Sequence, residues 1–315
     1  MRRESEDELN DQGYAVLEKV SNTFVQALRS FCESAEGLLK EDGQVNDDLL
    51  SLYFSCLRFL RTNEQIDEDY AFYLLNSGKD LKVKLFCINP SSRLEAGFKK
   101  MDSTICFSAT MKPQEYFDRL LGLDEEAKWY QLPSPFNPEN LGVFVASYIG
   151  TSFKERSSSL DDLVELIRQV TLSNPGNYLV FFPSHAYLQA AFEAFGAAWP
   201  DQLIISQRRM MTEQDRQDFL EHFQTKSHVV GFAVMGGVFG EGIDLRGKRL
   251  VGVVVAGVGL PQLGVERELI RQYFGGERTG FEFAYQYPGM SRVLQTAGRV
   301  IRDAGDKGII CLVDR

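Results

Sequence analysis

The 315-residue sequence predicts an α/β fold, a parallel sheet with helices on both faces, preceded by a mainly helical segment. The sheet is indicated by short apolar runs in the second half of the chain, at residues 143–148, 178–182, 229–234, 250–255 and 309–313. These runs alternate with amphipathic stretches such as 160–170 and 212–223, a pattern typical of a parallel sheet buried on both sides. Ligands of such sheets bind at the carboxyl ends of the strands, so the following loops are candidate sites.

Residues 1–75 are predicted to form two or three helices. Apolar side chains recur there every three or four residues, as in the stretches that begin at Leu9 and Leu49. Turn residues are few, and the clearest break is the acidic stretch at 41–43.

Residues 76–131 are expected to contain two strands and a first candidate loop. The sequence alternates in polarity at 80–88, and a short apolar run at 103–107 ends in small residues that include Ser108 and Thr110. The two hydroxyls could bind phosphate oxygens or water, or they could belong to an ordinary hydroxyl-rich turn.

Residues 132–140 are predicted to be a linker. They contain Pro133, Pro135 and Pro138, and proline continues neither a helix nor a central strand. We therefore place a domain boundary there, with the second domain at 141–315. The chain stops directly after an apolar run, as expected of a cut rather than a natural end.

Composition restricts the classes of function. The net charge of −10 argues against a protein that coats nucleic acid over its whole surface, so any such contact must be local. The five cysteines are scattered without a C-x2-C pair, which predicts reduced thiols and no metal or iron–sulfur ligand set. No apolar run approaches the about 20 residues of a membrane span, and the charged start lacks a signal-peptide core. We expect a cytoplasmic, monomeric protein.

The segment Gln295–Arg302 is the most informative part of the chain. A helix is predicted from Pro288 to Gly305, which would supply a left-handed C-cap. On that helix Gln295, Gly298, Arg299 and Arg302 would share one face.

Two guanidiniums on one helix face could bind phosphate, because their fixed forks of donors fit its oxygens. Gly298 inside a helix costs about 1 kcal/mol relative to alanine, which suggests that something approaches the backbone there. The alternative is a solvated arginine face that pairs with carboxylates such as Asp303 and Asp306.

The loop at 236–244 has the sequence Gly-Gly-Val-Phe-Gly-Glu-Gly-Ile-Asp and is predicted to bind a ligand. Its glycines permit close approach to the backbone. Its carboxylates, on Glu241 and Asp244, could accept from a ribose hydroxyl or hold the neighbouring arginines. The alternative is a glycine-rich turn with solvated acids.

A further loop follows the apolar run at 178–182. Ser184 in this loop can cap the next helix, with His185 exposed, and this structural role is favoured on local grounds.

These four segments resemble motifs III, IV, V and VI of superfamily 2 helicases. The matching stretches are Phe-Ser-Ala-Thr-Met at 107–111, Val-Phe-Phe-Pro-Ser at 180–184, Gly-Glu-Gly-Ile-Asp at 240–244 and Gln-Thr-Ala-Gly-Arg-Val-Ile-Arg at 295–302. The sequence Gly-Leu-Pro at 259–261 is similar to the DinG/XPD branch. The resemblance covers residues from about 100 to the end.

The resemblance implies the C-terminal half of an ATP-dependent DNA helicase with RecA-like motor domains that moves 5′ to 3′ on single-stranded DNA. Residues 1–75 would belong to an insertion of motor domain 1, and 76–131 to the end of that domain with motif III. Residues 141–315 would form motor domain 2, with motifs IV, V and VI.

The resemblance also assigns roles to individual residues. Arg299 and Arg302 would be arginine fingers in phosphoryl transfer, positioned by Gln295. The residues expected at the nucleotide are Gly240, Glu241, Gly242, Asp244 and Gly298. The residues expected at single-stranded or forked DNA, where hydroxyls bind phosphates and rings stack on bases, are Ser108, Thr110, Ser184, Tyr187 and Phe239.

Two departures from the family pattern concern ATP. The chain contains no G-x-x-x-x-G-K-[ST] loop and no Asp-Glu-x-His sequence. ATP and its Mg²⁺ would therefore be bound mainly by an N-terminal motor domain, in which any iron–sulfur cluster would also lie. We expect the isolated chain to lack ATPase activity.

Two alternatives remain. One is a non-catalytic module, derived from a helicase domain, that binds DNA or protein. The other is a nucleotide-sugar or dinucleotide enzyme on a similar sheet, which is disfavoured because no G-x-G-x-x-G follows the first strand.

Overall fold

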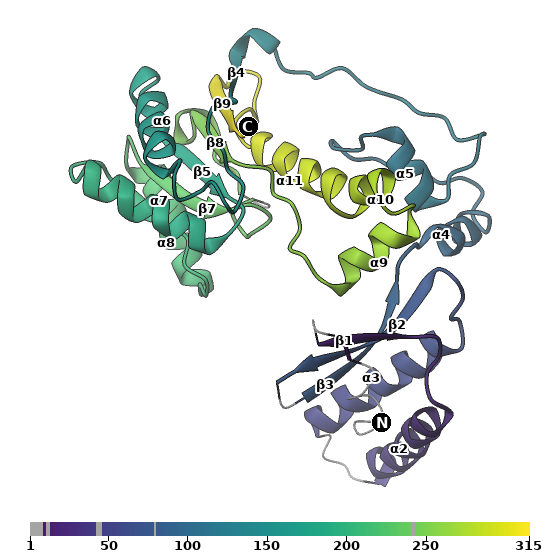
Figure 1. The fold of residues 1–315 in the computed structure, drawn as a ribbon. Coiled ribbons are helices and arrows are strands. Elements are labelled where there is room, and N and C mark those ends of the chain that lie inside the picture. Colours follow the sequence, from purple (N-terminus) through teal and green to yellow (C-terminus); the bar gives the residue numbers. More distant parts are fainter. Residues whose placement is uncertain (1–8, 11–12, 42–45, 79, 241–242) are drawn as a thin grey trace. The chain divides into compact units, whose positions relative to one another are not determined.

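The computed structural model describes residues 9–10, 13–41, 46–78, 80–240 and 243–315. They form two compact units that are interleaved along the sequence (Figure 1). The first unit takes the residues up to Cys106, with Gln114–Glu126 and Leu263–Phe281. The second takes Phe107–Pro113, Ala127–Gln262 and Glu282–Arg315. This division differs from a single boundary at 132–140, because the segment Leu263–Phe281 packs with the first unit.

The first unit contains a three-stranded antiparallel sheet, in the order β1 (Tyr14–Leu17), β2 (Tyr70–Ser77) and β3 (Asp80–Cys87). Its helices are α2 (Asn22–Glu41), α3 (Asp47–Asn63), α4 (Ser91–Phe98), α5 (Gln114–Leu121), α9 (Val265–Tyr273) and α10 (Arg278–Phe281). The segment 1–75 thus contains two helices, as expected, but also β1 and the start of β2. Strand β1 was not predicted because its partner β2 lies more than 50 residues away, with Tyr14 opposite Leu75.

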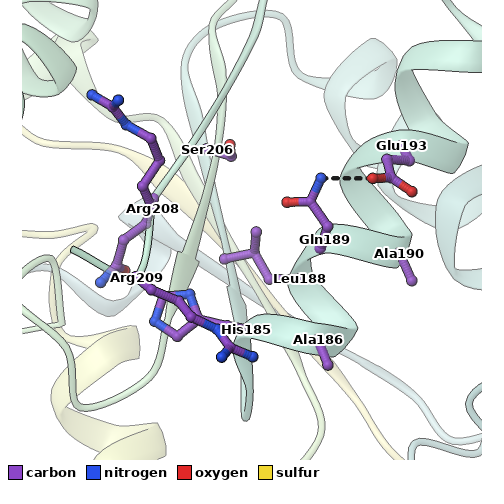
Figure 2. Close-up of a pocket in the computed structure, with 10 residues that line it drawn as sticks. His185, Ala186, Leu188, Gln189, Ala190, Glu193, Ser206, Arg208 and Arg209 are labelled. Atoms are coloured by element: carbon purple, nitrogen blue, oxygen red, sulfur yellow. Dashed lines mark hydrogen bonds between the residues drawn. The ribbon is translucent and has the colours of Figure 1, made fainter. Parts of the chain in front are cut away.

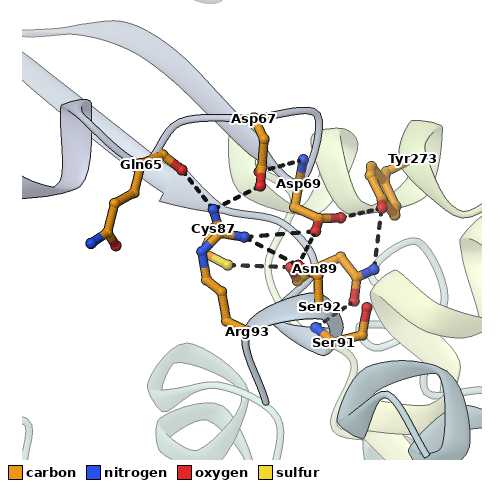
Figure 3. A network of polar contacts seen from close by, with 9 residues as sticks. All are labelled: Gln65, Asp67, Asp69, Cys87, Asn89, Ser91, Ser92, Arg93 and Tyr273. Carbon is orange, nitrogen blue, oxygen red and sulfur yellow. Dashed lines mark hydrogen bonds and ion pairs between the residues drawn. The ribbon is translucent and has the colours of Figure 1, made fainter. Parts of the chain in front are cut away.

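The segment Leu263–Phe281 joins the first unit through buried polar contacts (Figure 3). Tyr273 on α9 donates a hydrogen bond to the carboxylate of Asp69 and accepts one from Asn89 Nδ2 at 3.1 Å. Asp69 is 6% exposed and also accepts from Ser92 Oγ at 2.6 Å. Glu266, near the start of the same helix, accepts a hydrogen bond from Tyr73 Oη at 2.8 Å.

The strand predicted at 103–107 does not form. These residues have no strand conformation, and Ile105 and Phe107 are 83% and 90% exposed. A strand needs a neighbouring strand to satisfy its backbone hydrogen bonds, and no strand in the described part of the chain pairs with this segment.

The second unit is built on a six-stranded parallel sheet. Its strands are β4 (Leu141–Ala146), β5 (Tyr178–Phe182), β6 (Ile204–Ser206), β7 (Val230–Val234), β8 (Gly252–Ala256) and β9 (Gly308–Val313). The order across the sheet is β4-β9-β8-β5-β7-β6, and every pairing is parallel. The prediction of a parallel sheet is confirmed.

Helices cover both faces of this sheet. On one face α6 (Leu160–Ser173) and α7 (His185–Ala198) pack on side chains such as Val180 and Phe182. On the other, α8 (Glu213–Thr225) and α11 (Tyr287–Ala297) pack on alternate residues such as Leu179 and Phe181. Since successive side chains of a strand point to opposite faces, one continuous apolar strand supplies both cores.

Local signals set the starts of two helices as predicted. Thr212 and Asp215 form a reciprocal capping box at the start of α8, with Asp215 N donating to Thr212 Oγ1 and Thr212 N donating to Asp215 Oδ2. Ser184 Oγ accepts from Tyr187 N at 3.3 Å and caps α7. Among the residues that the structure describes, no helix combines the length and apolar character needed to cross a membrane.

Candidate functional site: two edges of the parallel sheet

Helix α11 connects the two edges of the parallel sheet. Near its start, Gly289 faces Val258 and Leu260, which follow the carboxyl end of β8. Beyond its end, Val300 faces Gly308, the first residue of β9, so closely that a Cβ on that glycine would lie 2.2 Å from Val300 Cγ1. The candidate residues therefore fall into two groups, one at the amino edge of the sheet and one at the carboxyl edge.

Arg299 and Arg302 converge on one backbone carbonyl at the amino edge. Arg299 Nη1 lies 3.4 Å from the carbonyl oxygen of Ile243, and Arg302 Nη2 lies 3.3 Å from the same oxygen. Ile243 ends the glycine-rich loop and is buried in the core beneath α8 and α11. The loop at 236–244 and the segment Gln295–Arg302 are thus brought together, as the sequence predicted.

The two arginines do not lie on the helix, which corrects the prediction. Helix α11 ends at Ala297, Gly298 is its C-cap with φ −65°, Arg299 lies in the turn that follows, and Arg302 lies in the irregular segment after it. Gly305 does not cap the helix. The helix ends early because Val300 is drawn into the core, where it is 1% exposed.

No other part of the described protein closely approaches the backbone at Gly298, so the expected ligand contact stays a prediction. A Cβ built there would meet the carbonyl oxygens of Leu294 and Gln295, at 3.3 and 3.7 Å, which belong to the helix itself. Gly298 is the C-cap of α11, but at φ −65° that position does not require a glycine. Gln295 is exposed on the last turn of α11.

Asp244 does not hold Arg299 or Arg302. Its carboxylate accepts from Arg246 Nε at 2.9 and 3.1 Å, two residues away. The structural role expected of this carboxylate is filled instead by the carbonyl of Ile243. Glu241 and Gly242 lie outside the described residues.

The first part of the glycine-rich loop lies at the carboxyl edge, directly after β7. Gly240 N donates to Gly237 O at 2.8 Å, and a Cβ on Gly240 would lie 3.0 Å from Gly236 N. Gly236 has φ +69° and faces the side chain of Arg292. These glycines therefore serve a tight turn that packs against the protein's own side chains.

Two residues expected at DNA are in the core instead. Phe239 is 1% exposed and stacks on Phe219, with ring centroids 4.2 Å apart. Tyr187 is 3% exposed, packs edge-on against Phe182, and has the Arg156 guanidinium 4.8 Å from its ring centroid. Both aromatic rings are already covered by protein, so neither can stack on a base in this structure.

Ser108 and Thr110 form a small hydroxyl turn. Ser108 Oγ accepts from Thr110 N at 3.2 Å and lies 3.3 Å from Thr110 Oγ1. Ser108 is exposed and Thr110 partly so, which leaves both hydroxyls accessible. This is the geometry of the ordinary turn considered above.

A basic hollow of about 550 Å³ opens at the carboxyl edge, between α7 and the end of β6 (Figure 2). Arg208, Arg209 and His185 lie along one side of it, and Gln189 and Glu193 along the other. Burial and the neighbouring Arg209 charge lower the pKa of His185, which favours the neutral form of its ring.

The arginines of this hollow were not selected from the sequence. Arg208 pairs with Asp215 of the α8 capping box, which ties it to the start of that helix. A usable signal was present: two consecutive arginines lie two residues after a short apolar run, 203–205, and precede a helix cap. Arg292, whose Nη1 donates to Gly259 O at 3.1 Å, was missed for a different reason, because no local pattern distinguishes it.

Residues 167–315 match the model of the helicase C-terminal domain. Among curated proteins, the ATP-dependent DNA helicase CHL1 of Candida albicans is 25% identical over 305 residues, which cover 84% of this chain and 35% of that protein. The ATP-dependent DNA helicase XPD of Sulfolobus acidocaldarius is 21% identical over 98% of this chain and 55% of its own length. The chain thus spans between one third and somewhat over half of these relatives.

Solved structures share the fold. A structure described as XPD_APO superposes with a TM-score of 0.63 at 18% identity, covering 99% of this chain and 63% of that one. Another, described as XPD_Helicase, has a TM-score of 0.62 and covers 99% and 56%. The RecA-like helicase fold expected from the four motifs is confirmed: residues 167–315 match the helicase C-terminal domain, and the chain is similar to ATP-dependent DNA helicases of the XPD and CHL1 kind.

Proposed function

We propose that this chain supplies the C-terminal portion of an ATP-dependent DNA helicase, in which Arg299 and Arg302 act on ATP and the opposite edge of the same sheet contacts single-stranded DNA. The observation that carries the proposal is the convergence of both guanidiniums on the carbonyl of Ile243. The proposal also includes 5′ to 3′ movement, a role in DNA repair or replication, a monomeric state and a cytoplasmic location.

The amino edge would act as the arginine side of an ATP site. Arg302 is exposed and makes no ion pair with any described residue, so its remaining donors can reach a phosphate. Arginine fingers stabilise the charge that develops on the transferred phosphoryl group and raise kcat by about 10³ to 10⁵. Gln295, four residues before Arg299 and exposed, would hydrogen bond with the same ligand. ATP and Mg²⁺ would be held mainly by an N-terminal motor domain.

The carboxyl edge would contact the DNA backbone. Arg209 and His185 border the basic hollow, and Ser184 begins the helix beside it. Such groups bind phosphates without reading the base sequence. Tyr187 and Phe239 are excluded from this surface by their burial, so single or forked strands would be gripped here by charge rather than by these two rings.

One loop joins the two edges. The segment from Gly236 to Leu250 leaves the carboxyl end of β7 and returns to the amino end of β8. A structural change at the edge that contacts DNA would therefore be transmitted through a short stretch of backbone to Ile243, whose carbonyl accepts from both arginines. This supports a motor in which the state of ATP and the grip on DNA are coupled.

The test is the DNA-stimulated ATPase of the complete gene product. Arg299→Ala and Arg302→Ala should each lower kcat by at least 10³-fold with little change in DNA affinity. Lys248→Ala, which removes an exposed charge from the same edge, is the matched control and should keep normal turnover. Normal turnover in both arginine variants would refute the mechanism, and an inactive complete product that still binds DNA would favour the non-catalytic binding module.

A further inference from the structure

The buried carboxylate of Asp306 binds the backbone of the segment that carries Arg299 and Arg302. Asp306 is 5% exposed, and its side chain accepts three backbone hydrogen bonds. Asp306 Oδ1 accepts from Gly247 N at 2.9 Å. Asp306 Oδ2 accepts from Arg302 N and from Asp303 N, both at 2.8 Å.

These three bonds join two segments that are far apart in the sequence. Gly247 follows the glycine-rich loop and has φ +62°, a left-handed turn that glycine adopts without strain. Arg302 lies 55 residues later, after α11. The two segments are the ones whose Ile243 carbonyl and arginine side chains meet, so Asp306 holds the backbone of both partners in that contact.

The backbone of the arginine segment is also held from the core side. Val300 is 1% exposed and packs over Gly308, where an added Cβ would lie 2.2 Å from Val300 Cγ1 and 2.8 Å from Val251 O. Arg299 and Arg302 stand on either side of Val300 in the chain. Packing thus sets the position of Val300, and Asp306 sets the position of Arg302 and of the loop that faces it.

We infer that Asp306 is a positioning residue of the ATP site: it binds no nucleotide itself, but it pre-sets the geometry in which Arg299 and Arg302 act. The inference depends on the proposed function. Groups that stabilise a transition state work best when they are already in place, because no reorganisation is then needed during the reaction. Loss of the carboxylate should therefore impair the chemical step and leave ATP and DNA binding largely intact.

The test uses Asp306→Asn in the complete gene product. Asparagine keeps the oxygen that faces Gly247 but turns an N–H₂ group toward the amides of Arg302 and Asp303, which are donors themselves. We expect kcat for DNA-stimulated ATP hydrolysis to fall at least tenfold, with KM for ATP and DNA affinity changed less than threefold. Asp303→Asn is the matched control, since it removes the same charge from an exposed neighbour whose carboxylate bonds the amide of Ala304.

A second measurement reads the local structure without activity. Hydrogen exchange should be at least tenfold faster in Asp306→Asn at residues 245–249 and 300–305, and unchanged in the central strand β5. Asp306→Glu keeps the charge but displaces the carboxylate by one methylene, and it should be impaired in the same way. If Asp306→Asn does not fold, Asp306→Glu carries the test.

The outcomes separate this inference from the proposed function. Inactive arginine variants together with a fully active Asp306→Asn or Asp306→Glu would overturn the positioning role and leave the arginine mechanism standing. Active arginine variants would instead overturn the proposed function. A fall in kcat with no change in hydrogen exchange at 300–305 would also contradict the positioning role.

Discussion

Tyr273 donates a hydrogen bond to the buried carboxylate of Asp69, which lies 204 residues earlier in the chain. The contact joins α9 to the sheet of the first unit, together with the Asn89 and Ser92 bonds to the same pair. It explains why the segment Leu263–Phe281 is part of that unit although the parallel sheet surrounds it in sequence.

Tyr273→Phe should destabilise the first unit by about 1–2 kcal/mol, because the substitution removes a hydrogen bond to a buried charge. Both tryptophans, Trp129 and Trp199, lie in the second unit, so their fluorescence does not report on this change. Native-state hydrogen exchange of peptides from β2 and α9 is the suitable measurement. Tyr130→Phe, at an 80% exposed tyrosine, is the control, and equal exchange in the two variants would contradict the prediction.

The stability of the first unit should fall in acid through Asp69. Burial alone would raise the pKa of Asp69, but hydrogen bonds from Ser92 and Tyr273 and the charge of Arg93 outweigh it, so the pKa lies below its ordinary value. A lowered folded-state pKa stabilises the fold above about pH 4 and loses this contribution as the pH falls through the folded value.

Asp69→Asn tests this dependence. The variant should be less stable than the wild type at pH 7. The difference should shrink as the pH falls below about 4 and through the lowered folded-state pKa of Asp69, because the wild-type carboxylate is then protonated as well. Exchange in β2 peptides between pH 4 and 7, corrected for intrinsic rates, and urea unfolding below pH 4 provide the measurement. Asp102→Asn, an exposed site in the same unit, is the control; a difference from wild type that is independent of pH would refute the assignment.

Arg209→Ala should weaken single-stranded DNA binding at the basic hollow. If Arg209 contacts one phosphate, the slope of log affinity against log salt should decrease by about 0.7 for a single strand. Fluorescence anisotropy of the complete gene product with a labelled oligonucleotide, at several salt concentrations, measures this slope. Lys226→Ala removes an exposed charge before β7, at the opposite edge, and should leave the slope unchanged. Equal slopes for wild type and Arg209→Ala would place the DNA elsewhere.

Phe239→Ala should act on stability rather than selectively on DNA binding. Removal of a buried ring that stacks on Phe219 is expected to cost about 3–5 kcal/mol. Urea unfolding followed by tryptophan fluorescence measures the loss in the second unit. Phe153→Ala, at a phenylalanine that is 87% exposed, should change stability by less than about 0.5 kcal/mol. Reduced DNA affinity at unchanged stability would contradict this prediction and indicate that Phe239 contacts DNA.

The parallel sheet was predictable because its signals are local. Apart from the three-residue strand β6, each strand of the sheet is an apolar run in the sequence. Strand β5 was predicted with the bounds that it has in the structure, Tyr178–Phe182. The caps at Ser184 and Thr212 depend on side chains within three residues of the amides that they bind. The same locality explains the failure at 103–107, where an apolar run has no strand partner among the described residues.

The sequence by itself determined five of the six strands of the parallel sheet, the four helicase-like segments and the pairing of the glycine-rich loop with Gln295–Arg302; the short strand β6 was not predicted. Tertiary structure decided where each functional side chain lies. It ended α11 at Ala297, buried Tyr187 and Phe239, and separated the candidate residues between two edges of one sheet. The physical reason is that these outcomes depend on contacts between residues distant in sequence. The bond from Gly247 N to the Asp306 carboxylate is an example, since the two residues lie 59 positions apart.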